Sequence, residues 1–371
     1  MFQKERVLEA KKYLETITNE KNLPGCSILI ADHGQESLYF ESGFSDLENK
    51  IPFKRDAICR LFSVSKVFTT IAVHKAIELG LLSKNNLLSE FLPCFSRPKV
   101  LMEGGLLKEV SSPTIHDLLN MCAGFGYGEG KNGEVFADVE KSNYSISTQE
   151  FASLIAKNPL LYVPGTKRAY SVAADLLGAV IEKVSHLRFG EFLDKYVFKP
   201  AKLKDTGFSL SDKQRERLIP CYFLEEGQWK RMEKTNLGIQ IEGRKNSFES
   251  GGAGLFSTID DVSRFGVALL EGKILAKETL ESLYKEEPDD LLFPSDWMAP
   301  EGMVYKNLLK VCRKEKEPND IPGDFGWNGW LGCHIALNAP IGRVYVFFTQ
   351  VAGYGEGEEN REFRRILYKN S

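Results

Sequence analysis

Residues 61–80 read LFSVSKVFTTIAVHKAIELG, and this stretch combines a helix pattern with a reactive pair of side chains. Apolar residues fill most positions after Ser65, and Gly80 ends the pattern, so a largely buried helix is predicted. Residues three apart lie one turn along the same side of a helix, so the Ser63 hydroxyl and the Lys66 amine can meet. A buried ammonium must be paired or give up its proton, and such a lysine can take a proton from a neighbouring hydroxyl.

The plainer interpretation of this Ser-x-x-Lys pair is structural. Ser63 can cap the helix, and Lys66 can extend along apolar surface to reach water. The positive end of the helix would nevertheless favour negative charge that develops near Ser63. The pair therefore needs support from other parts of the chain.

Two further segments can supply that support. Tyr170 follows the turn at 164–166 and precedes the helical pattern VAADLLGAVIEKV, so its hydroxyl can face a cleft, although most tyrosines at such positions only pack. Residues 325–332, FGWNGWLG, place three glycines and two tryptophans before the strand pattern CHIALN. The tryptophans can line an acyl or alcohol pocket, or the segment can be a tight turn with core aromatics. The Gly-rich segment 249–258 lacks the GxxxxGK pattern, so we do not expect it to bind phosphate.

Composition narrows the class of protein. The chain has 371 residues, 43% of them hydrophobic, and 48 Lys+Arg against 51 Asp+Glu give a net charge of −3. This balance gives no electrostatic reason to expect nucleic acid or a membrane as a partner. The seven cysteines and five histidines show no metal-ligand spacing, so we expect no metal and no cofactor. The charged N-terminus has no signal-peptide pattern, and we expect a cytoplasmic protein.

The order of elements predicts an α+β fold. Strand hairpins are expected near both ends of the chain, at 26–44 and 333–351, and the segments between them are mostly helical. We therefore expect an antiparallel-sheet lobe from residues 1–80 and 245–371, with the Ser63 helix at its interface, and a mainly helical lobe from residues 81–244. Residues 98–113 and 125–146 are expected to be loops of the helical lobe that border the cleft.

Taken in order, these segments resemble the serine hydrolases of the class C β-lactamase and penicillin-binding-protein superfamily. The resemblance covers nearly the whole chain, from LPGCSILIADHGQ through LFSVSKVFT, TIHDLLNMCAGFGYG, PGTKRAYSVAADLLG, KLKDTGF and GGAGLFSTIDDVSRF to FGWNGWLGCHIALN. Among its branches, the family VIII carboxylesterases and related transesterases look most similar. The resemblance implies a β-lactamase/transpeptidase-like α/β/α sandwich. The run Lys204-Asp205-Thr206-Gly207 looks like a structural turn of this family rather than a displaced Lys-Thr-Gly motif.

The resemblance also implies roles for individual residues. Ser63 would be the acylated nucleophile, Lys66 its proton partner and Tyr170 the general base, with an oxyanion hole made by the backbone amides of Ser63 and Trp330. The substrate would contact Tyr127 and four residues of the third motif, which are Trp327, Asn328, Gly329 and Trp330. His334, on the strand that follows, is expected to be structural.

Two departures from the family pattern bear on the substrate. β-Lactamases and transpeptidases of this kind have Tyr-x-Asn and Lys-Thr-Gly motifs, whereas this chain has Val172 and Trp327-Asn328-Gly329. Without that amide and that lysine, we expect weak or no penicillin hydrolysis and a preference for uncharged esters. We therefore expect a carboxylesterase-like serine hydrolase that acts on a small-molecule ester or amide. The alternatives are an acyltransferase, a D-amino-acid amidase or peptidase, a weak β-lactamase and a non-catalytic sensor. The sequence does not determine the oligomeric state.

Overall fold

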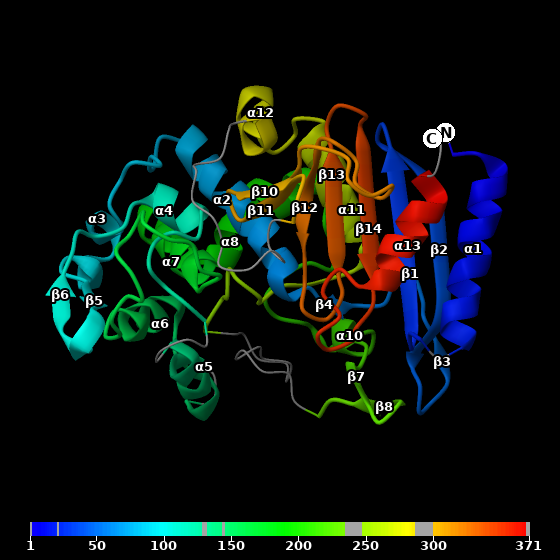
Figure 1. Cartoon of the computed structure of the whole chain (residues 1–371), viewed down its shortest axis with the longest axis horizontal. Coiled ribbons are helices and arrows are strands. Elements are labelled where there is room, and N and C mark those ends of the chain that lie inside the picture. The colour runs from blue at the N-terminus through cyan, green and yellow to red at the C-terminus, as the bar shows by residue number, and fades with distance from the viewer. Residues whose placement is uncertain are drawn as a thin grey trace.

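The computed structural model describes residues 2–20, 22–127, 132–142, 145–233, 247–285 and 300–368. A large sheet fills one half of the molecule and a group of helices fills the other, and the two chain ends lie close together beyond the sheet (Figure 1). Helix α2 (Ser65–Glu78) lies between the two halves (Figure 1). The predicted boundary at residues 244 and 245 lies outside the described residues, and the division into lobes at these positions stays a prediction.

Eight strands form the main sheet, in the order β10-β11-β12-β13-β14-β1-β2-β3. Their bounds are β1 Gly25–Asp32, β2 Gln35–Asp46, β3 Ile51–Pro52, β10 Met303–Lys306, β11 Leu309–Cys312, β12 Asp324–Asn328, β13 His334–Asn338 and β14 Arg343–Phe348. The neighbouring strands are antiparallel, and β1 pairs with β14 from Ser27 opposite Phe348 to Asp32 opposite Arg343. Strands from the two ends of the chain thus meet at the middle of one sheet.

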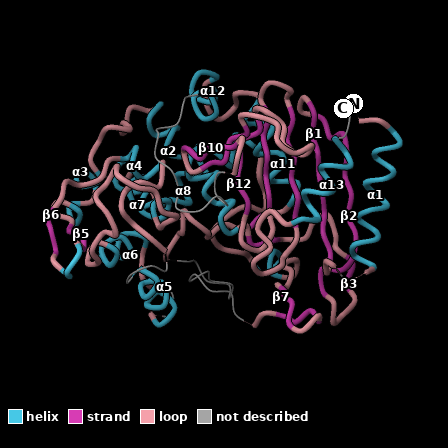
Figure 2. The backbone as a smooth tube through the Cα atoms, viewed as in Figure 1, coloured by secondary structure: helices cyan, strands magenta, loops and turns pink. Residues whose placement is uncertain are grey.

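Both faces of the sheet are covered, which explains why β1 is apolar at nearly every position. Ile28 and Ile30 pack into the core beneath α1 (Lys4–Asn19) and α13 (Glu358–Tyr368). Leu29 and Ala31 point to the other face, where α11 (Ile259–Leu270) lies. This arrangement makes helix, sheet and helix layers in one half of the molecule (Figure 2).

The other half contains most of the remaining helices, which are α3 Leu88–Phe91, α4 Ile115–Leu119, α5 Asn132–Lys141, α6 Thr148–Ile155, α7 Ala173–Ser185 and α8 Phe189–Leu193. Short elements complete the described chain: α9 Lys199–Ala201, α10 Asp212–Arg215, α12 Lys277–Lys285, and the strand pairs β4 Cys59–Arg60 with β9 Phe256–Ser257, β5 Lys99–Leu101 with β6 Leu107–Glu109, and β7 Tyr222–Glu225 with β8 Gln228–Arg231. Reciprocal caps start α4 at Thr114 and α6 at Ser147, where each hydroxyl accepts from the amide three residues on.

The predicted α+β fold, with its sheet built from both chain ends and an inserted helical part, is confirmed. Two predicted loops were wrong in part. Within 125–146 the chain forms α5, because Val135, Phe136 and Val139 give it a buried face. Within 98–113 it forms the β5–β6 hairpin.

Candidate active site

Ser63 lies in a single tight turn, Phe62–Val64, that leads directly into α2. Phe62 has a φ of +46°, a left-handed conformation that is strained for a side chain of this size. The turn continues into the helix, and residues three apart lie about one turn along the same side, so the side chains of Ser63 and Lys66 can meet. Lys66 Nζ donates a hydrogen bond to Ser63 Oγ at 3.1 Å. The sequence prediction that these two groups meet is confirmed.

Lys66 is fully buried, with 0% of its surface exposed. Its ammonium has three protons to donate, and three acceptors surround it. Besides Ser63, Nζ donates to Tyr127 Oη at 3.0 Å and to the backbone oxygen of Gly252 at 2.8 Å. The lysine therefore does not reach solvent, and its amine is held in one place.

Tyr170 reaches the same serine from the segment that precedes α7. Its hydroxyl forms a hydrogen bond with Ser63 Oγ at 2.7 Å, and Lys66 Nζ lies 4.6 Å from the centre of its ring. Trp327, at the end of β12, donates from Nε1 to Tyr170 Oη at 3.2 Å. Ser63 Oγ thus contacts a cationic amine on one side and a phenol on the other.

The third motif ends β12 against the backbone that carries Ser63. A side chain at Gly329 would place its first carbon 2.3 Å from the Leu61 carbonyl oxygen, so only glycine fits there. Trp330 follows, and its ring lies 5.6 Å from the Phe62 ring. The backbone of residues 329–330 therefore lies alongside the tight turn. An oxyanion hole made by the amides of Ser63 and Trp330 stays a prediction.

Comparison with known proteins places the chain in a family. Residues 10–369 match the family model described as Beta-lactamase. The chain belongs to the β-lactamase family. It is a serine hydrolase of this family, and its large antiparallel sheet with flanking helices is the β-lactamase/transpeptidase-like fold.

Individual relatives refine the comparison. Esterase EstB from Burkholderia gladioli is 29% identical over 362 residues, which cover 91% of this chain and 88% of that protein. The structure of EstCE1, a hydrolase with promiscuous acyltransferase activity, superposes with a TM-score of 0.81 at 25% identity and covers 98% of both chains. Simvastatin synthase (LovD) from Aspergillus terreus, in a mutant form, has the same fold, with a TM-score of 0.79 at 19% identity over 99% of this chain and 94% of that chain.

Two of the three aromatic residues expected to contact the substrate lie deeper than the sequence suggested. Trp327 is only 2% exposed and packs edge-on against Tyr305, and it contacts Tyr170 through its N–H and its ring. Tyr127 contacts Lys66, and burial raises the pKa of its hydroxyl well above the usual value, with the carboxyl of Asp175 adding to the effect. Trp330, 41% exposed, is the tryptophan of the third motif that presents a ring to solvent. Asn328 is half-buried beside it.

Gly252 is a part of the site that the sequence analysis missed. Its segment was rejected as a phosphate loop and quoted among the family-like segments without a site role, yet the Gly252 carbonyl oxygen accepts a hydrogen bond from Lys66. A backbone oxygen has no signature in a sequence. The glycine itself was the available signal, because a side chain there would strike Tyr127 Oη at 2.6 Å.

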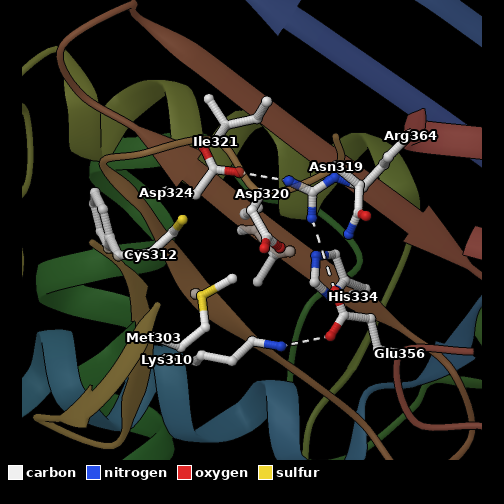
Figure 3. A pocket seen from close by; sticks show the side chains of 14 residues that line it. Met303, Lys310, Cys312, Asn319, Asp320, Ile321, Asp324, His334, Glu356 and Arg364 are labelled. Atoms are coloured by element: carbon white, nitrogen blue, oxygen red, sulfur yellow. Dashed lines mark hydrogen bonds and ion pairs between the residues drawn. The ribbon is translucent and has the colours of Figure 1, made fainter. Parts of the chain in front are cut away.

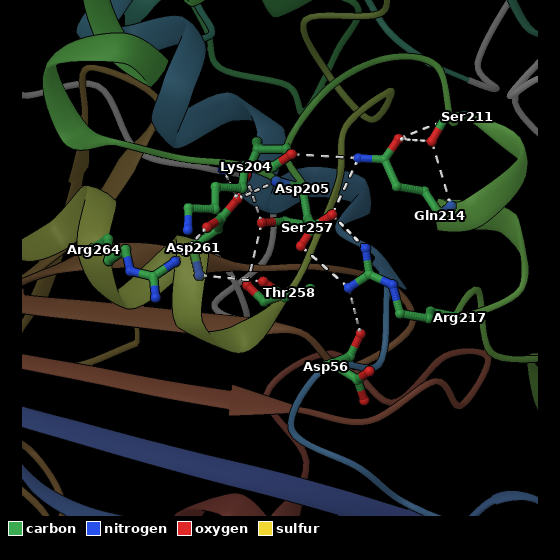
Figure 4. Close-up of polar contacts among 11 residues, drawn as sticks. Asp56, Lys204, Asp205, Ser211, Gln214, Arg217, Ser257, Thr258, Asp261 and Arg264 are labelled. Carbon is green, nitrogen blue, oxygen red and sulfur yellow. Dashed lines mark hydrogen bonds and ion pairs between the residues drawn. The ribbon is translucent and has the colours of Figure 1, made fainter.

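The Lys204-Asp205-Thr206-Gly207 run is a structural turn, as the sequence resemblance indicated. Asp261 Oδ2 accepts from the amides of Lys204 and Asp205 at 2.8 and 2.6 Å, and from Thr206 Oγ1 at 3.0 Å (Figure 4). Asp261 itself is buried in α11. These contacts tie the turn to the helix that covers the sheet, and none of them involves Ser63.

A small cavity of about 30 Å³ lies beside β11, β12, β13 and α13 (Figure 3). Its walls carry the ion pairs Lys310–Glu356 and Arg364–Asp324, at 2.5 and 2.6 Å. His334 lines it as well, and burial lowers the pKa of this imidazole to about 3. Ser63, Lys66 and Tyr170 are not among the residues that line this cavity, so it is separate from the candidate active site. His334 belongs to the packing of the sheet.

Within the described ranges, no group of three or more His, Cys, Asp or Glu side chains is arranged to hold a metal ion. The described helices also include none with the length and apolar character needed to cross a membrane.

Proposed function

We propose that the protein hydrolyses small, uncharged carboxylic esters through an acyl intermediate on Ser63. The observation that carries this proposal is the position of Ser63 Oγ, which is hydrogen-bonded to Lys66 Nζ at 3.1 Å and to Tyr170 Oη at 2.7 Å. A nucleophilic hydroxyl needs a proton acceptor within hydrogen-bond reach, and a nearby cation favours the charged form of that acceptor.

The steps follow from these contacts. Tyr170, in its phenolate form beside the Lys66 cation, takes the Ser63 proton while Ser63 Oγ bonds to the ester carbon. The backbone amides of Ser63 and Trp330 hold the negative oxygen of the tetrahedral intermediate. Tyr170 then gives the proton to the alcohol oxygen as the carbon–oxygen bond breaks. Water attacks the acyl carbon, Tyr170 takes its proton, and that proton returns to Ser63 as the acid leaves.

The third motif supports an uncharged ester as the substrate. Trp327 provides an indole N–H at the site, where the third motif of penicillin-binding relatives has a lysine. Without a second cation at this position, the site has no attraction there for a carboxylate on the substrate. The name of esterase EstB, a relative over 91% of this chain, supports the same reaction class.

Acyl transfer to an alcohol is the second candidate for the same site. It is favoured by the similarity to EstCE1, which is described as a hydrolase with promiscuous acyltransferase activity. The two reactions share the acyl-Ser63 intermediate and differ only in whether water or an alcohol resolves it.

The test uses p-nitrophenyl acetate and butyrate, with S63A compared against S96A, which makes the same change at an exposed serine. We expect S63A to lose turnover and S96A to keep it, with both proteins folded by circular dichroism. Intact-mass measurement after treatment with a fluorophosphonate should find one adduct in the wild type and none in S63A. Turnover by S63A would overturn the proposal.

Product analysis with added methanol separates hydrolysis from transfer, because transfer yields the methyl ester.

A further inference from the structure

A buried carboxylate lies behind Lys66, and the proposed reaction gives it no role. Asp175 occupies the first turn of α7 and is 1% exposed. Its neighbours along the helix are all apolar and equally buried. Because an ionised carboxylate loses much of its hydration in such surroundings, a residue of this kind is costly unless other groups compensate.

The two oxygens of Asp175 have different surroundings. Oδ1 accepts from Ser250 Oγ at 2.5 Å and from the Gly252 amide at 3.1 Å. Oδ2 is buried and has no hydrogen-bond partner within the described chain. Oδ1 therefore holds the loop that carries Gly252 in place. The partial negative charge on Oδ2 is not compensated by a hydrogen-bond donor of the described chain.

Oδ2 faces the cluster around the reactive lysine. A side chain at Gly252 would place its first carbon 2.8 Å from Asp175 Oδ2 and 2.6 Å from Tyr127 Oη, so both oxygens border the same small space. The carbonyl of Gly252 accepts from Lys66 Nζ. Burial raises the pKa of Asp175, and the Lys66 cation acts in the opposite direction, so the two charges interact across this glycine.

We propose that Asp175 is a positioning residue that keeps Lys66 as an ammonium and holds the Gly252 carbonyl against it. This inference rests on the proposed function and extends it by naming the residue that holds Lys66 in the cationic form that the proposed steps use. Asp175 acts only through Lys66 and the Gly252 loop, and it does not touch the substrate.

The other ionisable groups around this cluster come from three segments. Tyr127 and Tyr170 contact Lys66 directly, and Tyr305 of β10 interacts electrostatically with both tyrosines. Arg168 is buried and donates to the Tyr305 carbonyl at 2.7 Å. Asp175 is the carboxylate that interacts with Tyr127 and with Lys66.

The test is D175N, which keeps the shape and the Oδ1 acceptor but removes the charge. A nearby negative charge favours the protonated forms of both Lys66 and Tyr170, so its loss should move both limbs of the pH profile to lower pH, by about one unit. On the alkaline limb we therefore expect kcat to fall by up to about tenfold, and on the acid limb to rise by a similar factor, while KM stays within about twofold. S250A is the matched control, because it removes one hydrogen bond and keeps the charge, and its two limbs should stay in place.

The pH profile should be measured twice, with p-nitrophenyl butyrate and as the rate of fluorophosphonate labelling of Ser63. Labelling does not depend on ester turnover, so a wild type that is labelled but hydrolyses no ester contradicts the proposed function alone. A slower D175N whose limbs do not move shows a packing role and overturns the inference about Asp175.

If D175N does not fold, stability provides the test. K66M leaves the Asp175 carboxylate buried without its cation, so K66M/D175N should unfold at a higher urea concentration than K66M. A double variant less stable than K66M would overturn the inference.

Discussion

Trp327 and Tyr170 are joined by a hydrogen bond from the indole Nε1 to the phenol oxygen, at 3.2 Å. The phenol oxygen is also 2.7 Å from Ser63 Oγ. Trp327 is therefore an uncharged hydrogen-bond donor to the oxygen of Tyr170, the residue proposed as the base. A donor to this oxygen stabilises it most when it carries negative charge.

Replacing Trp327 by phenylalanine should test this relationship. W327F removes the N–H and keeps an aromatic ring, so we expect kcat for p-nitrophenyl butyrate to fall by about 10- to 100-fold, the range for a hydrogen bond to a charged group. The acid limb of the pH profile should move to higher pH. Y170F should cost about 10²- to 10⁴-fold. The double variant should be no slower than Y170F, and additive losses would show that the two residues act independently.

Gly329 provides a second test, of the packing between β12 and the tight turn. In G329A the added carbon would lie 2.3 Å from the Leu61 carbonyl oxygen, so the backbone beside Ser63 must shift. We expect a loss of about 1–3 kcal/mol in the free energy of unfolding, as for other overpacked sites, together with a lower kcat. G207A is the control, because the nearest atom to its new carbon is 3.7 Å away. Equal effects of the two variants would contradict this account.

The turn at 204–207 gives a prediction about stability without catalysis. D261A would leave three donors of the turn without their acceptor, and we expect it to lower the free energy of unfolding by about 3 kcal/mol or more. K204M changes only an exposed side chain and should leave esterase activity within about twofold. A large loss of activity in K204M would mean that this lysine serves the site after all.

His334 makes stability depend on pH. Its pKa is lowered to about 3 in the folded protein, while the unfolded chain has an ordinary histidine. Below about pH 6.5 the unfolded state therefore binds a proton that the folded state does not, and each further pH unit removes up to about 1.4 kcal/mol of stability. From pH 7 to pH 5.5, urea unfolding should show a larger loss for the wild type than for H334Q. Parallel losses would contradict the assignment.

The sequence was sufficient for the fold and for the meeting of Ser63 with Lys66. The burial of β1 along almost its whole length agrees with its apolar residues, and the burial of most of α2 agrees with the many apolar residues in that helix. The Ser63–Lys66 contact follows from local geometry, since the two residues are one turn apart. Such predictions succeed because they depend on neighbours in the chain.

The rest of the site depends on long-range packing. Lys66 is held by Tyr127, 61 residues away, and by Gly252, 186 residues away, and no local pattern reports such contacts. The sequence did contain a signal for the burial of Trp327. Side chains of a strand point alternately to its two faces, so in DFGWN Phe325 and Trp327 lie on the same buried side. Helix α5 was missed because its Gly and charged residues obscured three apolar positions.

The position of β1 between β14 and β2 has a consequence for synthesis. The first hairpin leaves the ribosome early, yet the strand it pairs with, Arg343–Phe348, is made some three hundred residues later. Until then one edge of β1 carries unpaired backbone groups that can join another chain. Trp327 is synthesised nearly as late. Ser63 and Lys66 are therefore present in the nascent chain long before the tryptophan that contacts Tyr170. We expect a ribosome-bound chain to gain its reactivity only in the final tenth of translation, and to depend on being kept apart from its copies until then.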